Sequence, residues 1–237
     1  MMVKIALIDY DGTIHDSDVV LVRSLDGILG FSGEELYRIY VYDIHRALVH
    51  RMYLERHDDL MFHCRLIFQH IKRPFDQEAA WLICKKFEEA SEIAKKNPIY
   101  FPDALPAIRR MREAGVRLFL STGMGAEEKA RTFERFAGAN YFSGTFSEPS
   151  IGSLKTEPEY YRAALKIAGS DPRESVSVGD TPLSDIRPAK LVGMRTIWVN
   201  RRREPAPVDG DQIADRQVIN LLDAEEFLSR AGEFARG

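Results

Sequence analysis

The first run of apolar residues in this chain ends in two carboxylates, Asp9 and Asp11, which are followed by a turn at Gly12. Residues 4–8 have the pattern of a buried parallel strand, so both carboxylates lie at its carboxyl end, where open α/β sheets bind ligands. Buried carboxylates need a partner that neutralises them, and a metal ion is a suitable partner. The alternative for this segment alone is structural: one aspartate caps the turn and the other lies within it.

Hydroxyl and ammonium groups that could bind phosphate occur in two later segments. Ser121, Thr122 and Gly123 end a second predicted strand, and hydroxyls at a strand end can donate hydrogen bonds to phosphate oxygens. Lys155 precedes a helix predicted to begin near Pro158, and it could pair with a carboxylate and a phosphate together. The alternatives are ordinary loop composition for the first segment and a solvated surface lysine for the second.

Further acids follow a third predicted strand. Residues 175–178 lead into Gly179 and Asp180, and Asp185 follows one helical turn later. Together with the carboxylates after the first strand, an acid at this strand end predicts an oxygen-rich site for a cation.

In chain order, these segments resemble the four motifs of the haloacid dehalogenase-like hydrolase superfamily. Residues 9–13 match D-x-D-G-T, the Ser and Lys motifs follow, and residues 179–185 match G-D-x-x-x-x-D. Residues 12–17 and 185–194 are also similar to the family, with Val192 where alanine is usual. The segment after Lys155 reads Thr-Glu-Pro where Pro-x-Pro is common, a departure that affects loop stiffness more than chemistry.

The resemblance implies a Mg²⁺-dependent phosphatase that acts through an aspartyl-phosphate. Asp9 would be the nucleophile, and Asp11 the general acid that then serves as the base. Mg²⁺ would be held by a side-chain oxygen of Asp9, the backbone carbonyl of Asp11 and the carboxylate of Asp180. Thr13 and Asp185 would support these residues, Asp185 by orienting a water molecule or the motif lysine.

The resemblance also implies a phosphate-binding set. Ser121 and Lys155 would bind the phosphoryl oxygens, with help from the backbone amides of Thr122 and Gly123. Dehalogenases of the family generally lack an acid at the position of Asp11, because a halide leaves without a proton. Asp11 therefore favours phosphate-ester chemistry.

Three other functions stay open on the sequence. A phosphomutase that acts on a sugar phosphate would use the same residues and would shield the aspartyl-phosphate from water. A haloacid dehalogenase and a non-catalytic binding protein on the same fold are the remaining alternatives.

The organisation predicted for the chain is a core with an insert. Residues 15–97 show only helical patterns: a helix over 19–30, a second opened by a capping box at Ser32, a third after Asp59 and a fourth capped by Asp76. Such a bundle after the first motif resembles the family's helical cap, which supplies most of the substrate specificity.

Helix and strand patterns alternate in the rest of the chain, residues 1–14 and 98–237. Strands are predicted over 116–121, 141–144, 175–180, 195–199 and 217–219, with helices between them and one after the last. This alternation predicts an α/β fold with a doubly wound, Rossmann-like parallel sheet, into which the all-α helical cap is inserted.

Composition restricts the partners. The chain has 237 residues, 45% of them hydrophobic, and a net charge of −3, which argues against a nucleic-acid-binding surface. The basic run 201–203 is predicted to be a solvated loop. No apolar run is long enough to span a membrane, and a strand pattern begins too early for a signal peptide. We therefore expect a cytoplasmic enzyme, a monomer or homodimer, that acts on a small phosphorylated molecule.

The cysteines and histidines of the insert are not expected to bind metal. Cys64 and Cys84 are predicted to be reduced thiols rather than a disulfide. The insert also carries histidines that form no tight cluster with carboxylates along the sequence, so hydrogen-bonded or solvated rings are favoured over metal ligands. These are His45, His50, His57, His63 and His70.

Overall fold

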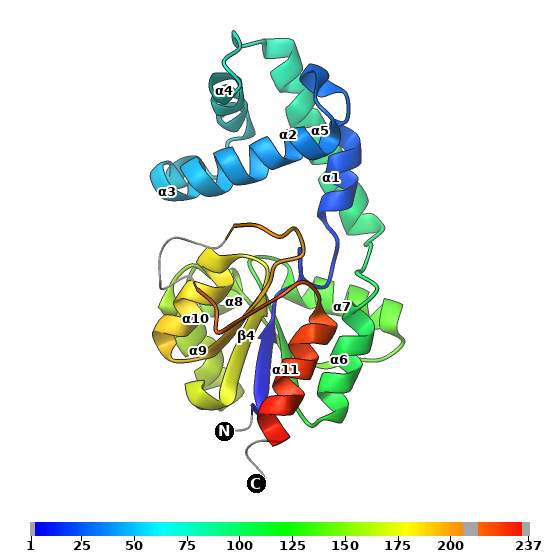
Figure 1. The fold of residues 1–237 in the computed structure, drawn as a ribbon, viewed down its shortest axis with the longest axis vertical. Helices are drawn as coiled ribbons and strands as arrows, with labels where there is room; N and C mark the ends of the chain where they lie inside the picture. Colours follow the sequence, from blue (N-terminus) through cyan, green and yellow to red (C-terminus); the bar gives the residue numbers. More distant parts are fainter. Residues whose placement is uncertain (1–2, 206–212, 234–237) are drawn as a thin grey trace. The chain divides into compact units, whose positions relative to one another are not determined.

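The computed structural model describes residues 3–205 and 213–233 of the chain (Figure 1). The chain divides into two compact units, Met1–Asp16 with Tyr100–Gly237, and Ser17–Ile99. We call the first the sheet unit and the second the helical unit. Among the described helices, none is long and apolar enough to cross a membrane.

The sheet unit is built on six parallel strands in the order β3-β2-β1-β4-β5-β6. Their bounds are β1 Ile5–Ile8, β2 Arg117–Thr122, β3 Phe142–Ser147, β4 Ser175–Gly179, β5 Arg195–Val199 and β6 Arg216–Val218. From the central β1, the chain adds β2 and β3 on one side and then β4 to β6 on the other. The strand order therefore reverses beside β1, where doubly wound sheets bind their ligands. The predicted α/β Rossmann-like core is confirmed.

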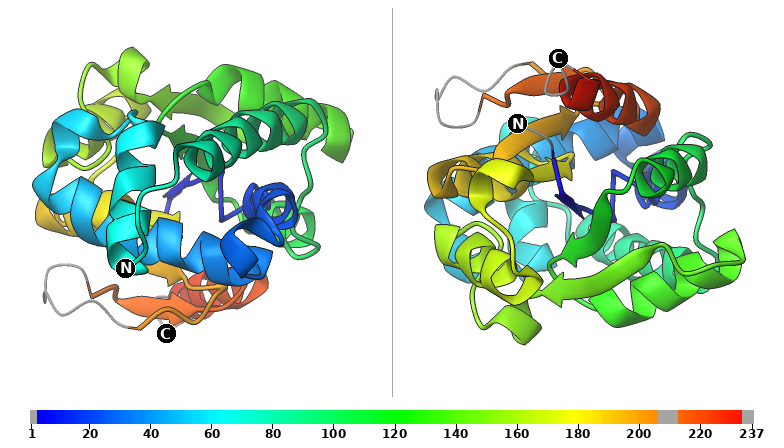
Figure 2. Two further views of the ribbon diagram at one scale, coloured as in Figure 1. Left: turned by 90° about the horizontal axis from the view of Figure 1, so that it is seen from above. Right: turned by 90° about the horizontal axis from the view of Figure 1, so that it is seen from below.

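Helices cover both faces of this sheet (Figure 2). They are α6 Ala104–Glu113, α7 Ala126–Ala137, α8 Glu148–Ile151, α9 Pro158–Ala168, the π-helical turn η5 Pro182–Ile186, α10 Arg187–Val192 and α11 Leu221–Glu233, with a 3₁₀ turn η4 at Pro172–Glu174. Alternate residues of β1 point to opposite faces: Ala6 and Ile8 belong to a core with α6, α7 and α11, whereas Ile5 and Leu7 belong to a core with α9 and α10. Two separate apolar layers thus hold the central strand.

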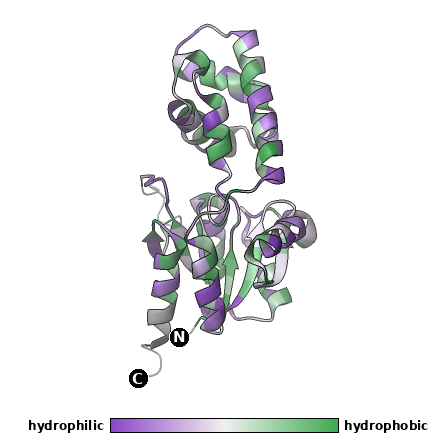
Figure 3. Cartoon of the chain, turned by 90° about the vertical axis from the view of Figure 1, so that its right-hand side faces the viewer, coloured by the Kyte–Doolittle hydropathy of each residue, from purple (hydrophilic) through white to green (hydrophobic). Residues whose placement is uncertain are grey.

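The helical unit has one apolar core of its own, which includes Leu25, Leu36, Ile44, Ile67 and Ile83. Figure 3 shows hydrophobic and hydrophilic residues alternating along its helices. Its elements are α1 Asp18–Leu25, η1 Ile28–Gly30, α2 Gly33–Arg38, η2 Ile39–Val49, α3 His50–Met52, η3 Leu54–Arg56, α4 Leu60–His70 and α5 Gln77–Lys96. The predicted caps are present, because Ser32, Asp59 and Asp76 accept hydrogen bonds from backbone amides of α2, α4 and α5.

Several predicted boundaries were wrong. The helix expected over 19–30 ends at Leu25, because Asp26 is extended (φ −60°, ψ 133°) and Gly27 adopts a left-handed φ of 79°. The strand expected over 141–144 continues to Ser147, where it leads into α8, a short helix that the sequence pattern did not predict.

Candidate active site

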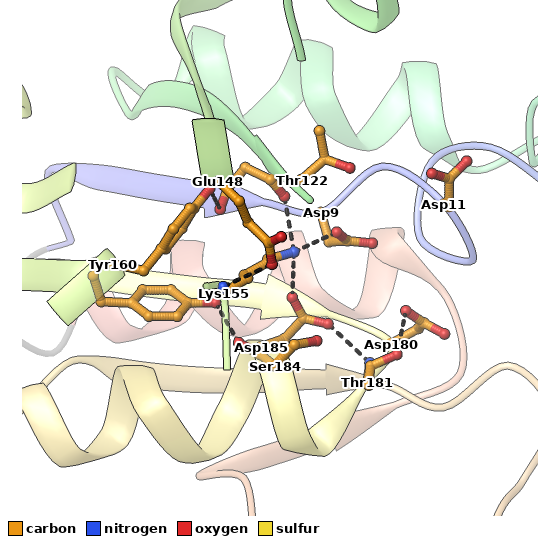
Figure 4. A network of polar contacts seen from close by, with 12 residues as sticks. Asp9, Asp11, Thr122, Glu148, Lys155, Tyr160, Asp180, Thr181, Ser184 and Asp185 are labelled. Carbon is orange, nitrogen blue, oxygen red and sulfur yellow. Dashed lines mark hydrogen bonds and ion pairs between the residues drawn. The ribbon is translucent and has the colours of Figure 1, made fainter. Parts of the chain in front are cut away.

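Residues from three neighbouring strands meet at the carboxyl edge of the sheet (Figure 4). Asp9 follows β1, Ser121 and Thr122 end β2, and Asp180 follows β4. The parallel registers Ile8↔Leu120 and Ile8↔Val178 bring these three strand ends to one level. Motifs that lie far apart in the sequence therefore become neighbours at the point where the strand order reverses.

Lys155 is buried among the motif carboxylates and is not a surface lysine. Its Nζ contacts Asp9 Oδ1, lies 2.6 Å from Asp185 Oδ1 and donates a hydrogen bond of 2.9 Å to the carbonyl of Ser121. Only 5% of the residue is exposed. A charge buried to this extent needs partners that are also charged, and the two aspartates meet that requirement.

The carboxylates of Asp9, Asp180 and Asp185 form an acidic group, with one oxygen of each within 4.8 Å of the others. Lys155 contacts two of these three carboxylates, so the group would have two more negative charges than positive ones if all three were ionised. Burial and the neighbouring acids raise the pKa of Asp9 to about 8, although Lys155 opposes this. The two aspartates beside Lys155 raise its pKa well above the usual value, despite its burial. The donor set fits a hard divalent cation, which would balance the excess charge.

Two glycines allow these carboxylates to approach the strand ends. A Cβ atom on Gly12, where φ is +76°, would lie 2.6 Å from Asp180 Oδ2. A Cβ atom on Gly179 would lie 2.2 Å from Cγ of Asp185. The glycines of the first and last motifs are therefore required by close packing against acids from the same site.

The side chain of Asp11 is separate from this network (Figure 4). Its Oδ1 pairs with His15 Nδ1 at 2.9 Å, and its Oδ2 lies 2.6 Å from Nζ of Lys129 on α7. Burial would raise the pKa of Asp11, but the His15 hydrogen bond and the Lys129 charge outweigh it and lower the pKa to about 2. In this arrangement Asp11 is ionised at neutral pH, which is the form of a general base.

The phosphate-binding candidates at the end of β2 have partners that the sequence analysis missed. Ser121 Oγ lies 3.0 Å from the hydroxyl of Tyr160, and Thr122 Oγ1 accepts a hydrogen bond of 2.9 Å from Lys129. Glu148 of α8 donates its amide to the carbonyl of Gly123 and accepts the amide of Lys155 on its side chain. This glutamate therefore joins the two loops that contain the candidate phosphate-binding residues.

Thr181 and Trp198 hold the last motif. The Thr181 amide donates to Asp185 Oδ2 at 2.9 Å, and its hydroxyl donates to Asp180 Oδ1 at 3.1 Å. The indole of Trp198 on β5 donates to the backbone carbonyl of Asp180 at 2.8 Å. Asp185 thus contacts Lys155, the residue that it was predicted to orient, and is itself part of the acidic group.

Arg201 corrects the prediction that residues 201–203 form a solvated loop. Its guanidinium pairs with Asp103, donates to the carbonyl of Thr13 at 2.7 Å and lies 3.8 Å from the ring centroid of Phe101. Asp103 also accepts the amide of Leu221 at 2.7 Å and makes no side-chain cap of α6. Thr13 is itself fully buried, so Arg201 ties the loop after β1 to the starts of α6 and α11.

The histidines of the helical unit lie closer together than the sequence indicated. The ring of His45 lies 4.9 Å from that of His57 and 5.5 Å from that of His63, measured between centroids. His63 Nε2 lies 2.8 Å from the carbonyl of Arg56, and burial lowers its pKa. Among the described residues, only Asp9, Asp180 and Asp185 bring three metal-ligating side chains within 4.8 Å. The side chain of His50 lies outside the described part.

Comparison with known proteins identifies relatives of this chain. A family model for haloacid dehalogenase-like hydrolases matches residues 3–193. A phosphoserine phosphatase of Thermus thermophilus is 33% identical over 154 residues, which are 61% of this chain and 59% of that protein. A glyceraldehyde 3-phosphate phosphatase of Methanopyrus kandleri is 28% identical over 135 residues, 55% of this chain and 58% of that protein. The alignments therefore span less than two thirds of these relatives.

A solved structure extends the similarity of fold to almost the whole chain. The magnesium-bound HAD-hydrolase YfnB of Bacillus subtilis has a TM-score of 0.70 with 18% sequence identity. The superposition covers 96% of this chain and 99% of that one.

Proposed function

Because the chain belongs to the haloacid dehalogenase-like hydrolase family, we propose that it is a Mg²⁺-dependent phosphatase of small-molecule phosphate monoesters. The observation that carries the proposal is that the two aspartates of the first motif have different contacts. Asp9 lies with Lys155 and two further acids, whereas Asp11 is held apart by His15 and Lys129. A nucleophile and a separate proton carrier need such different surroundings.

Asp9 is the proposed nucleophile. Its carboxylate attacks phosphorus, the P–O bond to the alcohol breaks, and an aspartyl-phosphate forms. Water then attacks phosphorus and releases inorganic phosphate with the Asp9 carboxylate restored. Ser121 and Lys155, with the amides of Thr122 and Gly123, bind the phosphoryl oxygens and stabilise their charge.

Mg²⁺ would be held by the carboxylates of Asp9 and Asp180 and by the backbone carbonyl of Asp11. When bound, it supplies positive charge that reduces the repulsion between the phosphoryl group and the attacking oxygen. Asp185 orients Lys155 through their 2.6 Å contact, and Thr13 supports the loop that carries Asp11.

Asp11 transfers protons in both steps. The ionised form in this structure suits the second step, in which it takes a proton from the attacking water. In the first step it donates a proton to the leaving alcohol oxygen, so Asp11 must carry a proton before this step begins.

The helical unit Ser17–Ile99 is the proposed cap that selects the substrate. The names of the relatives, phosphoserine phosphatase and glyceraldehyde 3-phosphate phosphatase, favour hydrolysis of small phosphorylated metabolites over the alternative, a phosphomutase that acts on a sugar phosphate. Phosphoserine and glyceraldehyde 3-phosphate are therefore the first substrates to test.

The test is phosphate release from a panel of phosphorylated metabolites by the native chain and by Asp9→Asn, each with Mg²⁺ or with EDTA. We expect release that requires both Mg²⁺ and Asp9. Asn keeps the shape of the side chain but is a poor nucleophile, so the variant controls for folding. Folded protein that binds Mg²⁺ but releases no phosphate from any member of the panel would refute the proposal.

A further inference from the structure

A second lysine, Lys129, lies at the candidate site. Its Nζ is 2.6 Å from Asp11 Oδ2 and donates a hydrogen bond of 2.9 Å to Thr122 Oγ1. Three quarters of the side chain is buried, since its exposed fraction is 25%. A lysine in this position has fixed partners on two sides, unlike a solvated surface lysine.

The contacts of Lys129 reach across the fold. Lys129 lies one turn into α7, whose N-cap residue Gly125 has a left-handed φ of 67°. Asp11 lies 118 residues earlier, in the loop after β1. The other Asp11 oxygen pairs with His15, whose ring is buried, so both oxygens of this carboxylate have defined partners.

Each aspartate of the first motif therefore has its own lysine. Lys155 contacts Asp9 within the acidic group, and Lys129 contacts Asp11 outside it. Lys129 also bonds to Thr122, the neighbour of Ser121 in β2. This second contact links the position of the Asp11 carboxylate to the strand end that is proposed to bind phosphate.

We propose that Lys129 is a positioning residue for Asp11. It holds this carboxylate at a fixed position relative to the end of β2 that is proposed to bind phosphate. The inference rests on the proposed function, in which Asp11 transfers a proton to and from oxygen. Proton transfer requires hydrogen-bond distance in the transition state, so a carboxylate that swings freely is a poor acid and base. A lysine that only bound substrate would instead act on KM.

The test compares Lys129→Met, Lys129→Arg and the control Lys166→Met, an exposed lysine on α9. Each is assayed with Mg²⁺ on two esters. Phosphoserine has an alkoxide as a poor leaving group, and p-nitrophenyl phosphate has a phenolate as a good one. We expect Lys129→Met to lower kcat for phosphoserine roughly 10- to 100-fold, with a much smaller loss for the aryl ester and little change in KM. Lys129→Arg should recover most of the loss, and the control should match the native chain.

An equal loss of kcat on both esters, or a change in KM alone, would overturn the inference. A second measurement needs no turnover: Tm for the native chain, Lys129→Met, Asp11→Ala and the double variant, all without metal. We expect the two single changes to be non-additive, because each removes the same contact. Additive shifts would refute the pairing. If the native chain releases phosphate from neither ester nor any member of the metabolite panel while the shifts are non-additive, the proposed function fails and the pairing stands.

Discussion

At the scale of single residues, the candidate site contains charged side chains whose burial costs free energy unless they are paired. Lys155 and Asp185 are 5% and 1% exposed, and Asp9 is 8% exposed. Their surroundings strengthen every ion pair and penalise any unpaired charge. The same burial raises the pKa of Asp9, and a cation between the carboxylates would oppose that rise.

Replacing Lys155 with Met tests this balance. The change leaves buried carboxylates without their ammonium partner and should destabilise the protein by roughly 3–5 kcal/mol. Mg²⁺ should recover part of the loss, since it supplies charge to the same group, so the Mg²⁺-dependent rise in Tm should exceed that of the native chain. Thermal unfolding with Mg²⁺ or EDTA measures both, with Lys166→Met as the exposed control. A variant as stable as the native chain without metal would contradict the buried network.

At the scale of elements, most residues of the candidate site lie on loops that follow strands, and glycines and side-chain contacts shape these loops. The loop after β1 turns at Gly12 and packs against Asp180 from the loop after β4. Its Thr13 carbonyl is fixed by Arg201, which also pairs with Asp103 at the start of α6. These loops are thus held by contacts from several elements.

Gly12→Ala and Gly138→Ala form a matched pair. Both glycines have a left-handed φ, +76° and +73°, but only at Gly12 would the new Cβ meet a carboxylate, at 2.6 Å. Both variants should therefore lose about 1 kcal/mol of stability from backbone strain. Only Gly12→Ala should also weaken Mg²⁺ binding, because Asp180 must move. Calorimetric titration with Mg²⁺ measures this, and equal affinities for the two variants would count against the packing argument.

The Asp103–Arg201 pair predicts a dependence of stability on pH. Burial would raise the pKa of Asp103, but the Arg201 hydrogen bonds and the Leu221 amide outweigh it and lower the pKa. A lowered pKa means that the contribution is complete above the unfolded pKa of about 3.9 and is lost as pH falls through the folded pKa. The stability difference between the native chain and Asp103→Asn should therefore shrink from pH 7 to pH 3.

Urea unfolding followed by Trp198 fluorescence measures this difference. Trp198 is buried in β5, and a Trp81→Phe background removes the signal of the helical unit. A difference that stays constant over this pH range would show that Asp103 contributes no charge-dependent stability.

At the scale of the whole molecule, the two units have separate cores, and the candidate site belongs to one of them. All of its described residues lie in the sheet unit, Met1–Asp16 with Tyr100–Gly237. A metal that binds there contributes free energy to the folded state of that unit.

Differential scanning calorimetry with and without Mg²⁺ tests this assignment. A Mg²⁺ concentration about 100 times Kd should stabilise the sheet unit by about 2.7 kcal/mol and raise its Tm by roughly 5–10 °C. The transition of the helical unit should not respond directly. Asp180→Asn should abolish the shift, whereas a shift that persists in this variant would place the metal elsewhere.

Much of this protein was determined by the sequence alone, because the signals are local. Apolar runs that end in Asp9, Ser121 and Asp180 predicted parallel strands and the edge at which they meet. Capping residues such as Ser32 and Asp76 predicted helix starts, since a cap acts within one turn of its own chain. The order of the motifs predicted the family.

Only the tertiary structure revealed which side chains support the motifs. Lys129, Tyr160 and Arg201 contact the site from elements that are distant in sequence, and each has the appearance of an ordinary helix or loop residue. Their partners depend on how strands pair and how helices pack over the sheet, and no local sequence pattern predicts these long-range contacts. For the same reason the sequence did not show that Asp11 is held apart from Asp9, two positions away: the turn at Gly12 and the packing of α7 decide it.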